Sequence, residues 1–310
     1  MSAWEEALVT GIYTVSPLHV GTGQSEGAID LPVAKEPHTG FAVIPASSLK
    51  GVARDAFERP AKNDEPRQKQ LETLFGPSTK KADEAIKDRK AEDSLYAGSI
   101  VFTEARLVAY AARSLNRPFV YVTCRLVLER LARDLRAADV RVMAIPRLPS
   151  GAASTLVADR VLSSSTLVIE DLVYTPDRIG ESSDVEEIGK SLAKLLPEDE
   201  VETRSRVQKN LVVIPDEDFA SIVRRLPVRA RIKLGDKKTT SDDDGNLWYE
   251  EQVPADCLFV SFIGVRPGKR GALADFKGNK KALEVSQIGG NETVGEGIVF
   301  WTLAEEGQAS

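Results

Sequence analysis

The sequence has very few of the side chains that build disulfide frameworks and tightly held metal centres. Among its 310 residues only Cys124 and Cys257 are cysteines, and only His19 and His38 are histidines. Two isolated cysteines exclude a disulfide framework and a thiolate zinc site, so both are predicted to be buried apolar thiols. We expect no tightly bound metal, although carboxylates could still hold a hard divalent cation such as Mg²⁺ or Mn²⁺.

Long hydrophobic runs are also missing. No apolar run approaches the roughly 18 residues that a membrane-spanning helix needs, and residues 1–6 (MSAWEE) lack the basic flank of a signal peptide. The sequence therefore predicts a cytoplasmic protein that has no membrane partner.

The chain has no overall excess of basic charge. Its formal charge is -6 and its pI is about 5.3, which argues against a protein that grips nucleic acid over its whole surface. Basic side chains gather in residues 264–281, where six lysines and arginines stand against one aspartate. Any contact with phosphate groups is therefore predicted to be local, and the composition by itself gives no indication of RNA.

Enough apolar sequence is present to build a packed core. The chain is 42% hydrophobic and 28% charged, which is typical of a globular protein. Predicted strands and helices mix without a regular alternation, and this favours an α+β fold over a doubly wound sheet. We predict strands at residues 7–15, 99–102, 166–174, 210–214, 229–234, 247–251, 257–265 and 298–303, and helices at 119–137, 185–195 and 216–225.

We expect one domain that spans residues 1–310. Residues 60–95 are polar and rich in charge, interrupted by a short apolar group, and they are interpreted as an insertion on the core. Partial disorder is expected around residues 78–93.

An amphipathic helix is predicted after residue 46, with Ser47 or Ser48 as its N-cap. Lys50 and Arg54 lie one turn apart near the N-terminus of this helix, where free N–H groups favour an anion. A phosphate-sized pocket is one interpretation. An ordinary solvated face is the other, and the helix alone favours it.

Two glycine-rich loops are predicted, one at residues 19–27 and one at residues 289–297. The second contains Gly289, Gly290, Gly295 and Gly297. Glycines permit positive φ angles and the close approach of another backbone, including that of a nucleic acid. Because no Gly-Lys-Ser/Thr ending follows, a nucleotide-cradling P-loop is not expected, and simple structural turns would also fit.

Residues 231–251 are predicted to form a long hairpin with a polar tip. An ordinary surface hairpin is the simplest interpretation of this segment. Trp248 and Tyr249 are better explained by packing at the base of the hairpin than by stacking on bases.

Taken in order, several motifs of the chain resemble one family. They are residues 13–23 (YTVSPLHVGTG), 27–32 (GAIDLP), 38–41 (HTGF), 44–51 (IPASSLKG), 247–251 (LWYEE) and the terminal glycine loop. Each motif alone is weak, but together they cover most of the chain. The sequence resembles the RAMP (repeat-associated mysterious protein) superfamily of CRISPR proteins and, within it, the backbone subunit of type III-B Cmr effector complexes.

This resemblance implies a modified ferredoxin-like (RRM-like) palm with finger insertions and a protruding β-hairpin thumb, which we assign to residues 231–251. It implies subunits that stack along a guide crRNA and cut complementary target RNA at regular intervals beside each thumb. The implied partners are guide crRNA, target RNA, further copies of the chain and other Cmr subunits.

The resemblance also implies a set of site residues. Asp30 matches the cleavage aspartate, which could hold a divalent ion against the scissile phosphate or take a proton from a 2′-hydroxyl. His19 matches a position in the same region, where orienting the loop is favoured over proton transfer. Tyr249 and Glu251 fall in a segment placed near the same site, although the adjacent Glu250 leaves their register open. Contacts to RNA are expected from Ser47, Ser48, Lys50, Arg54, Gly289, Gly290, Gly295 and Gly297.

Three alternatives stay open from the sequence. Asp30 could be an Asx-turn residue that stabilises its own loop before Pro32. The chain could be a catalytically inactive scaffold of a type III complex, and the type III-A subunit shares much of the pattern. It could also be an endoribonuclease that processes guide precursors, although the thumb-like hairpin favours the filament subunit.

Overall fold

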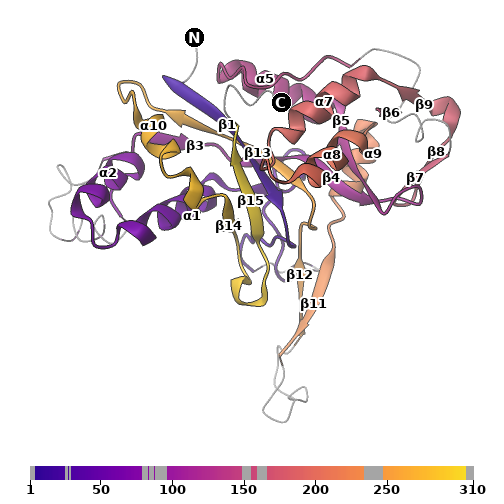
Figure 1. The fold of residues 1–310 in the computed structure, drawn as a ribbon. Coiled ribbons are helices and arrows are strands. Elements are labelled where there is room, and N and C mark those ends of the chain that lie inside the picture. Colours follow the sequence, from indigo (N-terminus) through magenta and orange to yellow (C-terminus); the bar gives the residue numbers. More distant parts are fainter. Residues whose placement is uncertain are drawn as a thin grey trace.

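A central mixed sheet of eleven strands carries the fold (Figure 1). A computed structural model describes residues 4–24, 27, 29–78, 83, 87, 96–148, 155–158, 166–233 and 247–304. The strand order is β14-β15-β1-β13-β4-β5-β10-β6-β9, with β2 added beside β4 and β3 beside β13. The strands are β1 (Glu6–Thr14), β2 (Val43–Ile44), β3 (Ile100–Phe102), β4 (Ala105–Arg113), β5 (Phe119–Cys124), β6 (Thr155–Val157), β9 (Ile179–Glu181), β10 (Leu211–Ile214), β13 (Leu258–Val265), β14 (Val285–Gln287) and β15 (Ile298–Leu303).

The middle of the sheet is antiparallel and joins distant parts of the chain. In β1, Ile12 lies opposite Phe259 of β13 on one side and opposite Trp301 of β15 on the other. The pairs β5–β10 and β6–β9 are parallel. The predicted α+β class is therefore confirmed, in the form of one large mixed sheet.

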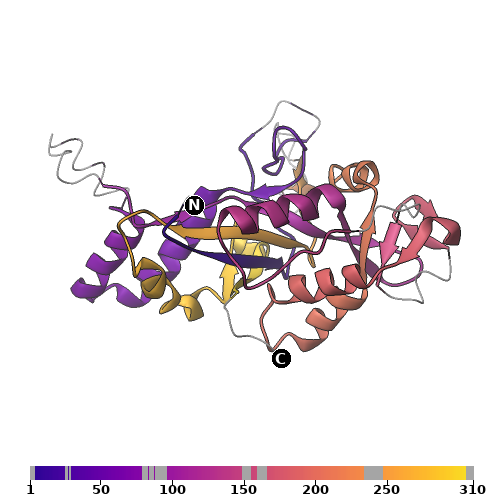
Figure 2. The same cartoon turned by 90° about the horizontal axis from the view of Figure 1, so that it is seen from above.

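Helices cover both faces of the sheet (Figure 2). They are α1 (Ala46–Glu58), α2 (Glu65–Phe75), α5 (Arg125–Ala137), α7 (Ser183–Ala193), α8 (Val201–Lys209), α9 (Asp216–Val223) and α10 (Ala272–Lys277). Helix α5 lies on one side of β1 and β13, and α7 with α8 lies on the other. This arrangement explains why β1 and β13 are apolar almost without alternation, since both faces of each strand are buried.

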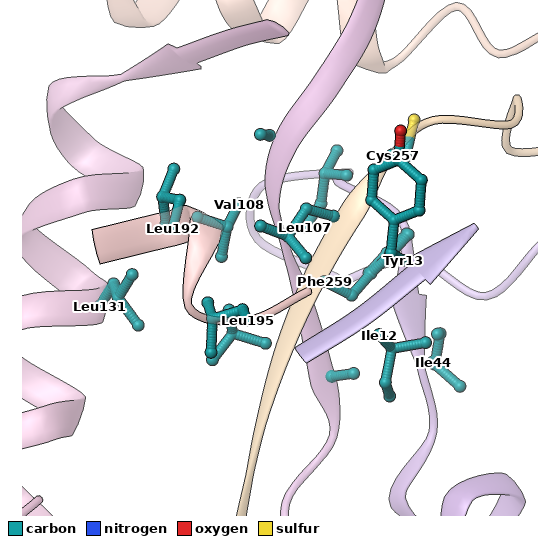
Figure 3. Packing of buried hydrophobic residues seen from close by; sticks show 14 of the residues in the cluster. Ile12, Tyr13, Ile44, Leu107, Val108, Leu131, Leu192, Leu195, Cys257 and Phe259 are labelled. Carbon is teal, nitrogen blue, oxygen red and sulfur yellow. The ribbon is translucent and has the colours of Figure 1, made fainter. Parts of the chain in front are cut away.

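The core is continuous across the sheet. Side chains from β1, β4, α7 and β13 interlock around Ile12, Val108, Leu192 and Phe259 (Figure 3). Leu195 approaches β1 so closely that a Cβ on Gly11 would lie 2.1 Å from its carbonyl oxygen. Glycine is therefore required at position 11 by close packing.

The helix predicted at residues 119–137 is wrong in its first third. Residues 119–124 form strand β5, and the helix starts at Arg125. The run FVYVTC is β-branched and aromatic and almost wholly buried, as expected for a central strand. Helical spacing of apolar residues begins only at Val127, and a window that joined the two segments missed the boundary.

Two other local predictions need correction. Residues 166–174 form not one strand but a small hairpin, β7 (Leu167–Ile169) and β8 (Leu172–Tyr174), turned by Glu170 at φ 51°. Helix α1 is preceded by Pro45 in an extended conformation, and neither Ser47 nor Ser48 caps it. Proline already has the φ that a helix start needs, so the helix begins without a side-chain cap.

The region interpreted as an insertion contains helix α2, which buries Leu71, Leu74 and Phe75. The disorder expected at 78–93 falls almost entirely outside the described residues. The sequence analysis missed three helices and five strands of the described chain: α2, α8, α10, β2, β4, β6, β9 and β14.

A two-stranded hairpin projects from the body of the molecule (Figure 1). Its strands are β11 (Val228–Ile232) and β12 (Leu247–Glu251), which pair from Val228 opposite Glu251 to Ile232 opposite Leu247. The predicted polar tip, residues 235–246, lies outside the described residues.

Cys124 and Cys257 are both buried and free, as predicted. In the described part of the chain, no helix is long and apolar enough to cross a membrane.

Candidate RNA-cleavage site at the base of the hairpin

The free edge of β12 gathers the residues predicted for cleavage. One edge of β12 pairs with β11, and the other meets the segment around Leu31. The amide of Leu31 donates to the carbonyl of Tyr249 over 3.1 Å, and the amide of Glu251 donates to the carbonyl of Leu31 over 3.0 Å. Residues two apart on a strand direct their backbone groups to the same edge, so positions 249 and 251 both serve this segment.

Asp30 is held against the hairpin by its side chain. Its Oδ2 accepts the backbone N–H of Tyr249 at 2.8 Å, across 219 positions of sequence. An Asx turn would direct that oxygen to an N–H of its own loop, whereas this bond reaches the hairpin. The carboxylate is only partly buried, so it stays open to a ligand at the hairpin base.

His19 is fixed on the same edge by its ring. Nδ1 donates to the carbonyl of Glu251 over 2.7 Å, and the residue is 7% exposed. Because a carbonyl oxygen only accepts hydrogen bonds, the proton in this bond belongs to Nδ1, and Nε2 is not part of the bond. Nε2 lies over Gly21, where a Cβ would come within 2.7 Å. The buried and anchored ring suits the predicted role of orienting the loop.

The structure resolves the register of the two glutamates. Glu251 is 2% exposed; its Oε2 accepts the N–H of Val33 at 3.1 Å, and its Oε1 accepts Lys35 Nζ at 2.6 Å. This carboxylate therefore holds the loop that carries Asp30. Tyr249, on the same face nearer the tip, is 42% exposed and available to a ligand.

The terminal glycine loop packs behind His19. A Cβ on Gly289 would lie 2.3 Å from the carbonyl of His19, and the amide of Gly290 donates to that carbonyl over 2.9 Å. Gly295 and Gly297 both have positive φ, at 80° and 77°. Close packing against the body, one of the roles expected for this loop, is what the structure shows for Gly289 and Gly297. Contact with RNA stays a prediction.

Sequence reasoning missed four residues that join this loop to the hairpin: Arg229, Arg231, Asn291 and Glu296. Glu296 is 2% exposed and accepts hydrogen bonds from both arginines and from Asn291. Once the two strands are aligned as a hairpin, Arg229 lies directly opposite Glu250, and this pairing of opposite charges could have indicated an ionic contact on that face. No local pattern indicates that these residues bind Glu296, because that contact depends on the tertiary fold.

The other four residues predicted to contact RNA, Ser47, Ser48, Lys50 and Arg54, lie together on α1 and form a second group. Lys50 and Ser47 line a pocket together with Tyr96, Gly98 and Arg266, and none of the described residues that line it is a carboxylate. Arg266 follows the end of β13 away from the hairpin, and eight strand residues span about 26 Å. The structure therefore does not bring this pocket next to Asp30.

Within this second group, Lys50 and Arg54 differ. Burial, followed by the charge of Arg54, lowers the pKa of Lys50. Arg54 donates to Glu58 at 2.6 Å and to the carbonyl of Pro77 at 3.0 Å, so its guanidinium is already engaged. Ser47 is exposed and Ser48 half-buried on the first turn of α1. Arg266 was counted only as part of the basic segment, and the pocket gives it a specific neighbour in Lys50.

The donor set at Asp30 does not make a complete metal site. Among the described residues, no three histidine, cysteine, aspartate or glutamate side chains gather in a way that could hold an ion. One carboxylate supplies at most two of the six or more oxygens that a hard cation takes. A divalent ion at Asp30 would take its remaining ligands from water and from phosphate oxygens of RNA.

Two buried carboxylates near the site predict a loss of stability in acid. Burial raises the pKa of Glu36, but hydrogen bonds from Arg130 and Thr39 outweigh it and leave the pKa below 4.5. Glu250 behaves alike, with bonds from Trp248 and Arg231. A folded-state pKa below the unfolded one stabilises the fold above about pH 4.5.

That stabilisation is lost as pH falls through the folded-state values. We expect the urea midpoint to drop as the pH is lowered below about 4.5, and to drop less steeply in Glu36→Gln. Denaturation curves at half-unit pH steps measure this, and identical slopes in the two proteins would contradict the assignment.

Comparison with known proteins gives the family. Residues 11–299 match the RAMP superfamily. The CRISPR system Cmr endoribonuclease Cmr4 of Pyrococcus furiosus is 33% identical over 307 residues, which cover 97% of this chain and 96% of the relative. The CRISPR system CMR subunit Cmr4 of Saccharolobus solfataricus is 27% identical over 93% of each chain.

Solved structures agree with the sequence matches. The crystal structure of oligomeric Cmr4 from Pyrococcus furiosus matches with a TM-score of 0.71 and 28% identity, over 97% of this chain and 98% of that one. The resemblance inferred from the ordered motifs is confirmed. On the match along nearly its whole length, the chain belongs to the RAMP superfamily and, within it, to the Cmr4 subunits of CRISPR Cmr complexes.

Proposed function

We propose that this chain is the filament-forming subunit of a type III-B CRISPR effector complex that binds guide crRNA and cleaves complementary target RNA. The observation that carries the proposal is the partly exposed carboxylate of Asp30, hydrogen-bonded to the base of a projecting hairpin. The endoribonuclease name of the Pyrococcus furiosus relative supports it. Further copies of the chain and other Cmr subunits are the protein partners.

The body of the chain is proposed to be the modified ferredoxin-like palm, and β11–β12 the thumb. The antiparallel core of β1, β13 and β4 with helices on its faces supports the first assignment. The projection of the hairpin supports the second. A wedge of this kind interrupts base pairing at a cost of about a few kcal/mol per unstacked step. Contacts along the filament would offset it.

For the chemistry, Asp30 is proposed to act directly on the scissile phosphodiester. Its carboxylate could accept the proton of the attacking 2′-hydroxyl. It could alternatively hold a divalent ion shared with the phosphate, an ion that would supply Lewis-acid polarisation when bound. His19 and Glu251 keep the Asp30 segment on β12, and Tyr249 offers an exposed ring and hydroxyl beside it.

Cleavage ladders from the reconstituted complex test this function. Target RNA should be cut into products that differ by a regular interval, and a chelator should abolish cutting if a shared ion is needed. Irregular products, or cutting that persists in complexes without this subunit, would count against the proposal. The anchored His19 ring gives no support to the alternative of a guide-precursor processing enzyme, in which histidine does the acid-base work.

The pocket beside α1 is proposed to contact the guide backbone, with Lys50 as its main cation. Lys50→Ala should weaken guide binding and reduce the slope of log affinity against log salt by about 0.7. Arg54→Ala should change the slope less, because its guanidinium is committed to Glu58 and Pro77. Fluorescence titrations at several salt concentrations measure the slopes.

Lys190→Ala is the matched control for this titration, since Lys190 pairs with Glu186 and Glu187 on the surface of α7. Its slope should equal that of the unchanged protein. An unaltered slope in Lys50→Ala would remove Lys50 from the RNA contact.

A further inference from the structure

The hairpin has two different faces. Arg229, Arg231, Trp248 and Glu250 share one face, because cross-strand partners point the same way. Val228, Ala230, Ile232, Leu247 and Tyr249 share the other and are all exposed. This apolar face is about half exposed and is covered only at its base, where Glu251, opposite Val228, is buried against Val33 and Lys35. Packing of apolar side chains therefore contributes little to the direction of the hairpin.

The polar face, in contrast, is bound to the body by a closed network. Glu296 Oε1 accepts Arg229 Nη1 at 2.8 Å, Gln252 Nε2 at 2.8 Å, and Arg231 Nη2. Its Oε2 accepts Asn291 Nδ2 at 2.9 Å. Glu296 thus accepts hydrogen bonds from two residues of β11, from the residue that follows β12, and from its own loop.

A second buried carboxylate continues the network. Glu250 is 3% exposed and accepts Arg231 Nε at 3.0 Å, Trp248 Nε1 at 2.8 Å and Asn291 Nδ2 at 2.9 Å. Asn291 therefore bridges the two carboxylates. The backbone of Asn291 is in the left-handed region, at φ 65°.

The network and Asp30 both form hydrogen bonds with strand β12. Asp30 bonds to the backbone of β12 at Tyr249, and Glu250, the next residue, bonds to the network. A rotation of the hairpin away from the glycine loop would move the Tyr249 amide and with it the carboxylate of Asp30. We propose that Glu296 is a positioning residue, which fixes the direction of the hairpin and thereby the placement of Asp30 against RNA.

This inference rests on the proposed cleavage function. It goes beyond it by giving a role to a residue that touches neither Asp30 nor the open side of the site. Displacement of a reacting group by about 1 Å can reduce a rate about 100-fold, so the effect should appear in the cleavage step and not in target binding.

The test uses the reconstituted complex with guide RNA and variants at position 296. Glu296→Gln keeps the shape and two acceptor lone pairs but removes the charge, and it should slow single-turnover cleavage at saturating target about tenfold; Glu296→Ala should slow it about 100-fold. The dissociation constant of the target should stay unchanged in both. Hydrogen exchange at the amides of residues 228–232 and 247–251 should quicken in the same order.

Glu170→Gln is the matched control, since it breaks the ion pair of Glu170 with Arg113 on the β7–β8 hairpin. Its cleavage rate should be that of the unchanged complex. Adding Arg229→Gln to Glu296→Gln should cause little further loss if the two act through one contact.

Several outcomes would overturn the inference: an unchanged rate in Glu296→Ala, a rate loss matched by weaker target binding, or a slower rate without faster exchange in the hairpin. Failure of the underlying function is distinguishable. In that case Asp30→Asn complexes would cleave normally, whatever the variants at position 296 do.

Discussion

Complexes that carry Asp30→Asn should bind target RNA with unchanged affinity and cleave it at least about 100-fold more slowly. Asparagine has the same shape, and its amide oxygen can still accept the Tyr249 N–H that Asp30 accepts at 2.8 Å. The loop should therefore stay on the hairpin, while the charge that accepts a proton or holds an ion is lost. Single-turnover cleavage and filter binding on the same complexes separate the two effects.

Asp199→Asn provides the control, because Asp199 is exposed in the turn before α8. It should leave both measurements unchanged. Normal cleavage by Asp30→Asn would refute the enzymatic role and leave a scaffold. Failure of Asp30→Asn to assemble would instead make Asp30 a structural residue of its loop.

Gly297→Ala should destabilise the chain by about 2–3 kcal/mol. Gly297 has φ 77°, and an added Cβ would lie 2.1 Å from the carbonyl of Ile288, a backbone atom that cannot easily move. Its amide also donates to the carbonyl of Pro17 over 2.8 Å, two residues before His19. Urea unfolding of the purified chain measures the change, and the cleavage rate should fall with it.

Gly51→Ala is the matched control for this substitution. Gly51 lies inside α1, and nothing is within 4 Å of an added Cβ. Alanine there should stabilise the chain by about 0.5–1 kcal/mol. Equal effects at positions 51 and 297 would show that the strain argument is wrong.

Elements with a strong local pattern could be predicted from the sequence. The strand at 298–303 matches β15 residue for residue, and those at 257–265 and 210–214 differ from β13 and β10 by one residue. Each is a short apolar run bounded by turn residues. The predicted boundary was wrong where a strand is followed directly by a helix with no turn residue between them, as at Cys124 and Arg125. Periodicity is averaged over a window of residues, and such a window joins the two elements.

Some features of the candidate site could likewise be predicted from the sequence, and others could not. The ordered motifs placed Asp30, His19, Tyr249 and Glu251 together, and the hydrogen bonds along β12 bring them to one edge. The sequence could not show which of Glu250 and Glu251 binds the Asp30 loop, because that depends on which face of β12 each side chain occupies. The partners of Glu296 lie between 5 and 67 positions away, and no local pattern encodes a pairing that depends on the tertiary fold.

The joining of His19 to Glu251 and Gly290 also determines when the site can form during synthesis. The first of these contacts spans 232 positions, and β15, which pairs with β1, is made after every other strand in the sheet. A chain still growing on the ribosome therefore contains Asp30 before the glycine loop and β15, which pack against the same region, have been made. The proposed cleavage centre is therefore complete only after residue 303 has been synthesised and β15 has docked against β1.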